Sequence, residues 1–454
     1  MKISKMCKKI TCGIIFILVV IFSFIYVHKN HIEQKIIPLL HENNIEFNQL
    51  SFDILPTPKL QLEEVKLQLN TSKFHFKNII ISTSISSLLL NKKIQLEEIY
   101  LQQGEIKNPN FNEVDIVIKP TALYLKDLLG LIKKNSNMKT INNDYLIELK
   151  ATDQQNNRVK LKTYSTLQPD KIKMKSLDLT IETPQAVFNH LNKLNLKAEK
   201  GAIIYSKVNH NINVNFNSIQ INHVNFNQIE GNINKDHLQI NGDFVIDKNN
   251  IKFNYTPINN IISHQNSTLQ ITANYLDTDK WLSVLELPVI LTGKSNLNAD
   301  LLLKNNIIQQ GNVNFNITMG NLKGLNILNI ISQGLPINYP QDISQNLDSP
   351  FNQLTAKLDW NRESLNISQL LMSNTYFYLK GAGKIQLHNM QCLFKINLYS
   401  NDEKYQDITL PITFFDDCYY PKYKVEINKS LRKQIKNLLK EKLQQKQNDT
   451  APIK

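Results

Sequence analysis

Histidine and cysteine are among the residues of this chain that could ligate a metal ion or act as nucleophiles. His210, His223 and His237 lie on separate predicted strands, without the short spacing of metal ligands. The sequence contains no HExxH, no Gly-x-Ser-x-Gly and no phosphate-cradling glycine loop. It also shows no pair of carboxylates in a recognisable catalytic setting. We therefore expect surface or turn histidines, no metal, no cofactor and no enzymatic activity.

Cys392 and Cys418 are the two cysteines outside the first twelve residues. If this part of the chain lies in an oxidising compartment, the pair could close a disulfide. Alternatively, Cys392 is a small residue of an apolar strand face, because it is in phase with Met390, Phe394 and Ile396. Cys418 then belongs to a tyrosine-rich loop. The sequence leaves both interpretations open.

Polar and apolar residues alternate through residues 211–247, NINVNFNSIQINHVNFNQIEGNINKDHLQINGDFVID. A period of two places successive side chains on opposite faces of a strand. The phase slips near Ser218 and again at His223, as turns or bulges between strands would cause. The apolar face predicted from this pattern comprises Ile212, Val214, Phe216, Ile219, Ile221, Val224 and Phe226. We interpret these residues as candidates for the lining of an apolar groove.

Strand patterns dominate the rest of the chain after residue 28. Short helices are predicted at 33–44, 183–195 and 277–288, the last two with a capping Thr or Asp at the start. From residue 289 onward, strands follow one another at intervals of roughly 10 to 15 residues, joined by Gly, Asn and Asp turns. This spacing favours antiparallel strands over βαβ units. The expected fold is mainly β, an elongated and curled antiparallel sheet of about 20 strands with an apolar-floored trough.

The N-terminus carries a predicted membrane anchor. Lysines cluster within residues 1–9, and residues 10–27 contain no charged side chain. As a helix, these eighteen residues would span about 27 Å, close to the ~30 Å core of a bilayer. No cleavage site of the small-x-small type follows. We expect an uncleaved signal anchor with residues 1–9 in the cytoplasm and the bulk of the chain on the other side of the membrane.

Residues 428–454 are predicted to form a basic amphipathic helix and tail. Leucine and isoleucine form one stripe, and Arg432, Lys433, Lys436 and Lys440 occupy the other positions. This pattern is typical of a helix that contacts a membrane surface or a partner, although it also suits a helix that caps the last sheet edge. The formal net charge is +13, but lysines cluster only at the chain ends. That distribution argues against a nucleic-acid groove.

Several ordered segments carry a family resemblance. They are FDILPTPKLQLEEVKLQL and SSLLLNKKIQLEEIYLQQGEI near the start, and GNVNFNITMGNLKGLNILNII, SPFNQLTAKLDW, SLNISQLLMSNTYFYLKGAGKIQL and LPITFFDDCYYPKYKVEINKSL near the end. In this order, behind an N-terminal anchor, they resemble the AsmA family. The resemblance covers about 52–106 and 289–431, and residues 107–288 match in style only. Asn361-Arg362-Glu363 departs from the glycine-containing turn usual in the family.

The resemblance implies a bacterial inner-membrane protein with a periplasmic body of the bridge-like lipid-transfer type. Its expected parts are an N-terminal β region, 28–288, and a C-terminal β region, 289–427. Expected partners are the inner membrane, membrane phospholipids and other envelope proteins, with no nucleic acid. Two alternatives remain: the apolar face is the closed core of a sandwich, or the protein is a scaffold that regulates insertion of outer-membrane proteins.

Overall fold

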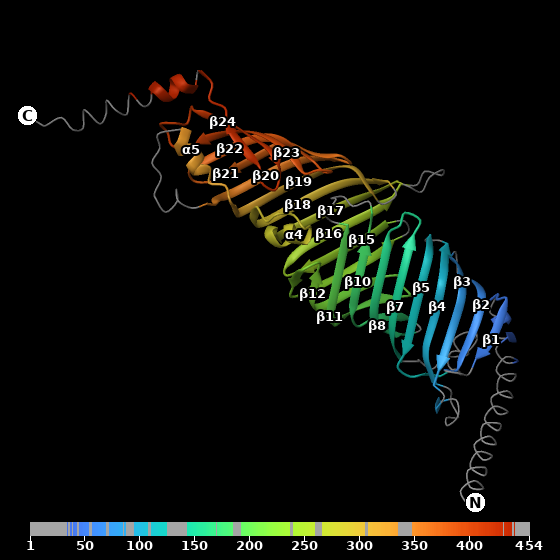
Figure 1. Cartoon of the computed structure of the whole chain (residues 1–454). Helices are drawn as coiled ribbons and strands as arrows, with labels where there is room; N and C mark the ends of the chain where they lie inside the picture. The colour runs from blue at the N-terminus through green and yellow to red at the C-terminus, as the bar shows by residue number, and fades with distance from the viewer. Residues whose placement is uncertain are drawn as a thin grey trace, which may run out of the picture. The chain divides into compact units, whose positions relative to one another are not determined.

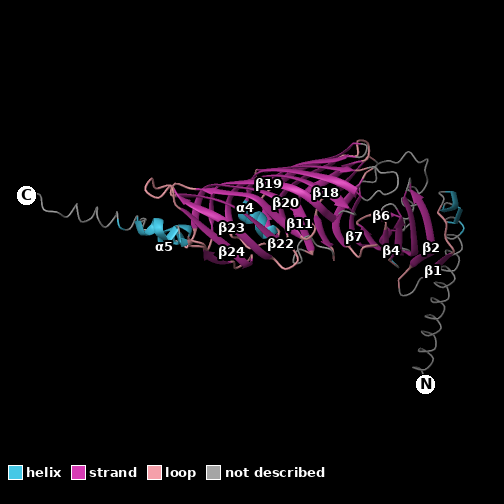
Figure 2. Cartoon of the chain, turned by 90° about the horizontal axis from the view of Figure 1, so that it is seen from above, coloured by secondary structure: helices cyan, strands magenta, loops and turns pink. Residues whose placement is uncertain are grey.

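The computed structural model describes residues 45–53, 57–69, 72–84, 86–87, 95–107, 110–124, 143–168, 170–184, 192–236, 239–258, 266–304, 307–334, 347–429 and 431–437, and positions 34, 37–38, 40–42 and 440. The chain divides into two compact units. Unit 1 comprises Met1–Pro184 with Asn195–Asn209, and unit 2 comprises Gln185–Leu194 with His210–Lys454. Antiparallel strands dominate the described part of both (Figure 1, Figure 2).

Unit 1 is an antiparallel sheet in which most neighbours in sequence are neighbours in space. Strands β1 to β5 pair in order, β7 pairs with β5, and β8 pairs with β7, β9 and β10. Its strands are β1 (Gln49–Asp53), β2 (Lys59–Leu69), β3 (Ser72–Thr83), β4 (Gln95–Lys107), β5 (Phe111–Pro120), β6 (Leu123–Tyr124), β7 (Asn143–Asp153), β8 (Arg158–Leu167), β9 (Lys171–Met174), β10 (Leu177–Glu182) and nearly all of β11 (Lys193–Ser206).

Unit 2 has the same antiparallel plan. Its strands are β12 (Ile212–Ile221), β13 (Val224–Phe226), β14 (Ile229–Asp236), β15 (Gln239–Ile246), β16 (Asn249–Pro257), β17 (Asn266–Asp277), β18 (Leu291–Lys304), β19 (Ile307–Leu322), β20 (Ser349–Asn361), β21 (Ser364–Ser373), β22 (Phe377–Gln386), β23 (Gln391–Ser400), β24 (Thr409–Asp417) and β25 (Lys422–Val425). Strand β12 pairs with β13 and β14, and each strand from β14 to β25 pairs with the next.

Two short helices interrupt unit 2. Helix α4 (Thr278–Val284) lies between β17 and β18, and α5 (Ile327–Gly334) lies between β19 and β20. A third helical segment follows β25, at the described positions 429, 431–437 and 440. Residues 34, 37–38 and 40–42 are also helical, and Leu40 packs against Phe52, Leu60, Leu62 and Val65.

Irregularities in three adjacent strands line up beside α4. Tyr275 in β17 and Met319 in β19 adopt positive φ values of 59° and 49°, and Gly293 in β18 lies between them at φ 127°. A Cβ atom at Gly293 would lie 2.8 Å from Cγ2 of Ile317 and 2.9 Å from Cα of Gly320, so this position requires glycine. Bulges bend a strand and increase its twist. The register shifts at these positions therefore favour a local bend of strands β17 to β19 beside α4.

The mainly β, antiparallel fold predicted from the sequence is confirmed, as is the helix predicted within 277–288. The described residues form 25 strands rather than about 20. The difference arises because β6, β9, β13 and β25 have only two to four residues, too few to show a period. Helix α5 was not predicted. The boundary proposed at residue 288 falls inside unit 2.

Several predictions concern residues outside the described part. No helix among the described residues is long and apolar enough to cross a membrane. The predicted cytoplasmic tail 1–9 and anchor 10–27 lie outside the described residues, as do most of the predicted helix 183–195 and the tail beyond residue 440.

Candidate functional site

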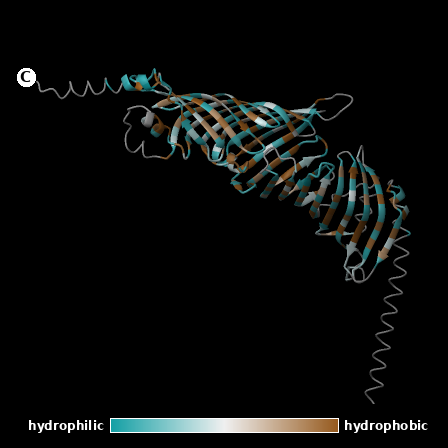
Figure 3. Ribbon diagram, turned by 45° about the horizontal axis from the view of Figure 1, so that its top comes forward, coloured by the Kyte–Doolittle hydropathy of each residue, from teal (hydrophilic) through white to brown (hydrophobic). Residues whose placement is uncertain are grey.

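Two apolar rows begin in β12 and cross every strand of unit 2 from β14 to β25. Each row takes one residue per strand, and neighbours in a row are register partners. Row A is Ile212, Ile233, Gly242, Phe253, Ile271, Ala299, Val313, Leu358, Ile367, Gly383, Phe394, Phe414 and Tyr423. Row B is Val214, Gly231, Phe244, Ile251, Ala273, Leu297, Phe315, Ala356, Leu370, Gly381, Ile396, Ile412 and Val425. These two rows form an uninterrupted apolar surface across the strands, which we call the apolar floor. Along each strand, hydrophobic and hydrophilic residues alternate (Figure 3).

Unit 1 carries a similar row on its own sheet. Row D takes one residue from each of seven strands, and every member is leucine or isoleucine. Row D is Leu62, Ile79, Leu101, Ile116, Leu149, Leu161 and Leu179. A continuous apolar row is thus a feature of both units.

Most residues of rows A and D are half-buried rather than buried. In row A, Phe253, Val313 and Leu358 keep part of their surface exposed, and in row D all members except Leu62 do so. Residues of a closed sandwich core interdigitate with a second sheet and lose this exposure. The apolar floor is therefore partly accessible along these rows.

Glycines in row A lie beneath aromatic rings of the neighbouring strand. A Cβ atom at Gly242 would lie 2.1 Å from Cε1 of Phe253, and one at Gly383 would lie 2.3 Å from Cδ1 of Phe394. The ring of each phenylalanine thus occupies the space that a side chain at the glycine would take. The phenylalanine rings thus cover the glycines, so the apolar surface has no gap where a glycine lacks a side chain.

A third row, row C, runs beside row B, and most of its residues are buried, although Ser295, the register partner of Leu276 and Ile317, is half-buried. Its buried members are Phe216, Ile229, Ile246, Leu276, Ile317, Leu354, Met372, Leu379, Leu398 and Leu410. From β19 onward these side chains form one cluster with four apolar residues of α5, which are Ile327, Leu328, Ile330 and Ile331. Helix α5 therefore closes one margin of the apolar face, and the cluster that it joins also includes Ile396 and Ile412 of row B and Phe414 of row A.

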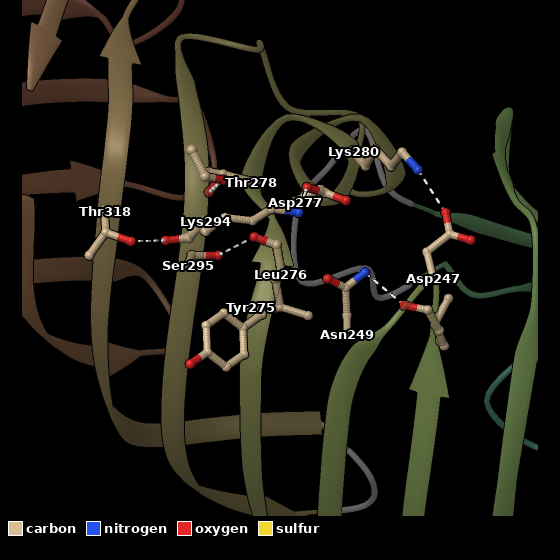
Figure 4. A network of polar contacts seen from close by, with 12 residues as sticks. Asp247, Asn249, Tyr275, Leu276, Asp277, Thr278, Lys280, Lys294, Ser295 and Thr318 are labelled. Carbon is tan, nitrogen blue, oxygen red and sulfur yellow. Dashed lines mark hydrogen bonds and ion pairs between the residues drawn. The ribbon is translucent and has the colours of Figure 1, made fainter. Parts of the chain in front are cut away.

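Helix α4 covers the hairpin formed by β12 and β13. The rings of Phe226 and Trp281 lie 5.5 Å apart between centroids, and Phe226 is buried. The side-chain amide of Asn222, in the hairpin turn, donates to the carbonyl oxygen of Val284 at 2.7 Å. Thr278 Oγ1 donates to the carbonyl oxygen of Gly293 at 2.8 Å, near the bulges described above (Figure 4). The helix is thus attached at both of its ends.

An ion pair attaches α4 to the turn between β15 and β16. Lys280 Nζ lies 2.7 Å from Oδ2 of Asp247, whose side chain is 9% exposed (Figure 4). Burial opposes ionisation of Asp247, but hydrogen bonds from Lys280 and from the backbone of Asn227 and Gln228 outweigh it. They hold the pKa of Asp247 below its ordinary value of 3.8. The hydrogen bond to Asp247 raises the pKa of Lys280 above 10.5. Both groups are therefore charged at neutral pH.

The seven candidate groove residues fall into different environments. Ile212 and Val214 begin rows A and B and are half-buried, whereas Phe216 belongs to buried row C. Ile219, Ile221 and Phe226 are buried, and Val224 is half-buried, in the hairpin that contacts α4. The structure thus brings all seven to one apolar face, and Ile212 and Val214 lie on its accessible rows. The sequence predicted the helix that is α4 but not its ion pair, since Asp247 and Lys280 are far apart in the chain.

Cys392 and Cys418 are both free thiols, and they lie close enough to hydrogen bond. Cys392 is the register partner of Asp416, and the backbone N–H of Cys418 donates to the carbonyl oxygen of Met390 at 2.8 Å. Burial raises the pKa of both thiols. Cys392 is buried in phase with the apolar face, as one of the two interpretations predicted. The adjacency of the thiols keeps the other interpretation open.

The predicted turn histidines are located as follows. His210 is exposed in the turn before β12, His223 lies in the turn between β12 and β13, and His237 lies outside the described residues. Among the described residues, no group of three or more His, Cys, Asp and Glu side chains is placed to hold a metal ion.

An open hollow of about 730 Å³ lies on the opposite face of unit 2. Its lining includes Gln270, Asp300, Asn312 and Asp359, which are register neighbours on the polar side of the sheet. Gln270 Nε2 donates to Asp300 Oδ1 at 2.9 Å. This polar hollow is therefore separate from the apolar floor.

Together the fold and site define a mainly β, antiparallel protein with a partly accessible apolar floor. The chain is similar to an uncharacterized protein of Haemophilus influenzae, with 24% identity over 438 residues that cover 96% of this chain and all of that protein. No protein-family model matches the chain. No solved structure matches it either. Membership of the AsmA family thus stays a prediction.

Proposed function

We propose that this protein binds phospholipid acyl chains along the apolar floor of rows A, B and D and supports phospholipid transport to the outer membrane. The observation that carries the proposal is the length and exposure of these rows. Row A crosses all strands from β14 to β25 without a polar side chain other than the Tyr423 hydroxyl, and much of it is half-buried. Soluble monomers rarely expose contiguous apolar patches larger than a few hundred Å². An apolar ligand would cover this surface.

Acyl chains suit a floor of this kind. They require no directed hydrogen bonds, and rows A and B offer none from their side chains except at Tyr423. A chain lying across the strands could shift along the rows without losing a specific polar contact. The polar face, with asparagine at positions such as 213 and 215, would remain in water.

We further propose that residues 10–27 anchor the chain in the bacterial inner membrane, with the N-terminus in the cytoplasm and the body in the periplasm. The lysines before the apolar segment support this orientation. A reporter enzyme that is active only in the periplasm, fused after Lys454, should be active. Activity of a cytoplasm-specific reporter at the same position would contradict the proposed topology.

Lipid analysis tests the proposed ligand. Phospholipid should co-purify with the full-length protein, and Val313→Glu should reduce its amount, because Val313 lies in the middle of row A. Asn312→Glu, one residue away on the polar face, is the matched control. Equal amounts of lipid in both variants would contradict binding on row A. If the purified protein carries no lipid, and deletion of the protein still impairs insertion of outer-membrane proteins, the scaffold alternative would be supported instead.

A further inference from the structure

The helix after β25 uses its apolar stripe to pack against the sheet of unit 2. The side chain of Asn428 caps its start, accepting a hydrogen bond from the backbone N–H of Leu431 at 2.8 Å. Leu431 is 4% exposed and belongs to the cluster formed by α5 and row C, and Ile435 packs against the same cluster. Among the described residues, the apolar positions of this helix are therefore occupied by contacts within the protein.

The remaining positions of the helix form a basic face. Arg432, Lys433, Lys436 and Lys440 are all exposed. The ion pairs found in the described part of the chain, such as Lys422 with Asp416, involve none of these four residues. Lys429, at the start of the helix, is also exposed. The helix thus presents a group of cations that no described carboxylate neutralises.

The basic face stands next to the strand where the apolar rows end. Row A ends at Tyr423 and row B ends at Val425, both in β25. Tyr423 is 43% exposed, and Tyr420 just before the strand is 84% exposed. Exposed tyrosines suit a boundary between water and lipid, because the ring is apolar and the hydroxyl is polar.

We infer that this helix docks the C-terminal end of the protein on an anionic lipid surface through charge alone, without insertion. An inserting amphipathic helix buries its apolar stripe in the membrane, but here Leu431 and Ile435 face the protein. Anionic lipid headgroups attract nearby lysine and arginine side chains, and salt screens this attraction. The inference goes beyond the proposed function and would hold for a scaffold as well.

The chemistry of the basic face favours a lipid surface over other anionic partners. Three of the four cations are lysines, which act as point charges and need no matching geometry. Specific recognition of nucleic acids or folded proteins relies more on arginine forks, aromatic stacking or a shaped groove. The described part of the helix carries no aromatic side chain.

Vesicle binding by the full-length protein in phosphatidylcholine nanodiscs tests the inference. Binding to vesicles that contain phosphatidylglycerol should exceed binding to pure phosphatidylcholine vesicles by more than about tenfold at low salt, and should fall as salt rises. The variant Arg432→Gln, Lys433→Gln, Lys436→Gln, Lys440→Gln should lose this preference. All four residues are exposed, so its unfolding midpoint should match that of the wild type.

A second variant controls for net charge. Lys66→Gln, Lys73→Gln, Lys107→Gln and Lys150→Gln remove the same charge from exposed positions of unit 1 and should leave vesicle binding unchanged. An equal loss in this control would overturn the inference, as would wild-type binding by the helix variant. The inference would also fail if the helix variant lost binding to polyglutamate or to an RNA homopolymer while its binding to vesicles was unaffected.

Discussion

Val214 and Phe216 lie two residues apart on the same face of β12, yet Phe216 is fully buried and Val214 is half-buried. The difference arises because Phe216 belongs to row C, which pairs it with buried Ile229, whereas Val214 begins row B. One strand therefore crosses from the closed margin of the apolar face to its accessible part. Two residues of one strand face can therefore belong to different environments, one in the buried core and the other on the accessible apolar floor.

This relationship predicts opposite effects of the same substitution. Phe216→Glu would bury a carboxylate without a partner, which costs several kcal/mol out of the roughly 5 to 15 that stabilise a domain. Val214→Glu keeps contact with water, so we expect the free energy of unfolding to fall by less than about 1.5 kcal/mol. Asn213→Glu, on the polar face, is the control. Chemical denaturation measures all three, and similar losses for Phe216→Glu and Val214→Glu would contradict the assignment of rows B and C.

The ion pair between Asp247 and Lys280 predicts a pH-dependent contribution to stability. Because the pKa of Asp247 is lowered in the folded state, its contribution is present above the ordinary carboxyl pKa of 3.8 and is lost as pH falls through the lowered value. The raised pKa of Lys280 means that its contribution is lost only as pH rises above 10.5. Asp247→Asn should therefore lower the free energy of unfolding at pH 7 and have a smaller effect at pH 2. An equal loss at both pH values would contradict the ion pair.

We predict that a side chain at Gly242, in row A, clashes with Phe253, and that a smaller residue at position 253 relieves the clash. Gly242→Ala places a Cβ atom against the ring of Phe253 and should destabilise the protein by about 1 to 3 kcal/mol. In the double variant with Phe253→Leu, the smaller side chain leaves room for the new methyl group. The free energies of the four proteins form a double-mutant cycle. Strict additivity would show that the ring does not occupy the space above the glycine.

The adjacent thiols predict a disulfide under oxidising conditions. Treatment of the folded protein with diamide should join Cys392 to Cys418, as each thiol loses a hydrogen atom and diamide takes up both. The reaction should be slow at neutral pH, because burial raises the pKa of both thiols and the thiolate is the reactive form. Closing this loop should stabilise the fold by roughly 3 kcal/mol. Mass spectrometry of the digested protein would show the linked peptides, and Cys392→Ser is the control.

The strands and the apolar face were predictable from the sequence because both depend on a period of two. Ile212, Val214 and Phe216 alternate with asparagine, and the structure places all three on one face. The phase slip near Ser218 also corresponds to two successive exposed residues, Asn217 and Ser218. Periodicity is a local property, so it is available without knowledge of the fold.

The division of that face into covered and accessible rows could not be predicted. It depends on α5, which was not predicted, and on contacts between distant segments of the chain. Similarly, α4 is attached to the turns after β12 and β15 through Asn222, which bonds to Val284, and Asp247, which pairs with Lys280, and no local pattern connects these residues to the helix. Tertiary contacts of this kind decide which apolar residues form a core.

Site-specific photo-crosslinking tests the central claim most directly. A benzophenone amino acid at position 313, in row A, and at position 312, on the polar face, would probe the two sides of β19 in the full-length protein within cells. We predict phospholipid adducts, detected by mass spectrometry, at position 313 and not at position 312. The absence of adducts at position 313, or equal adducts at both positions, would contradict the claim that the apolar floor binds acyl chains.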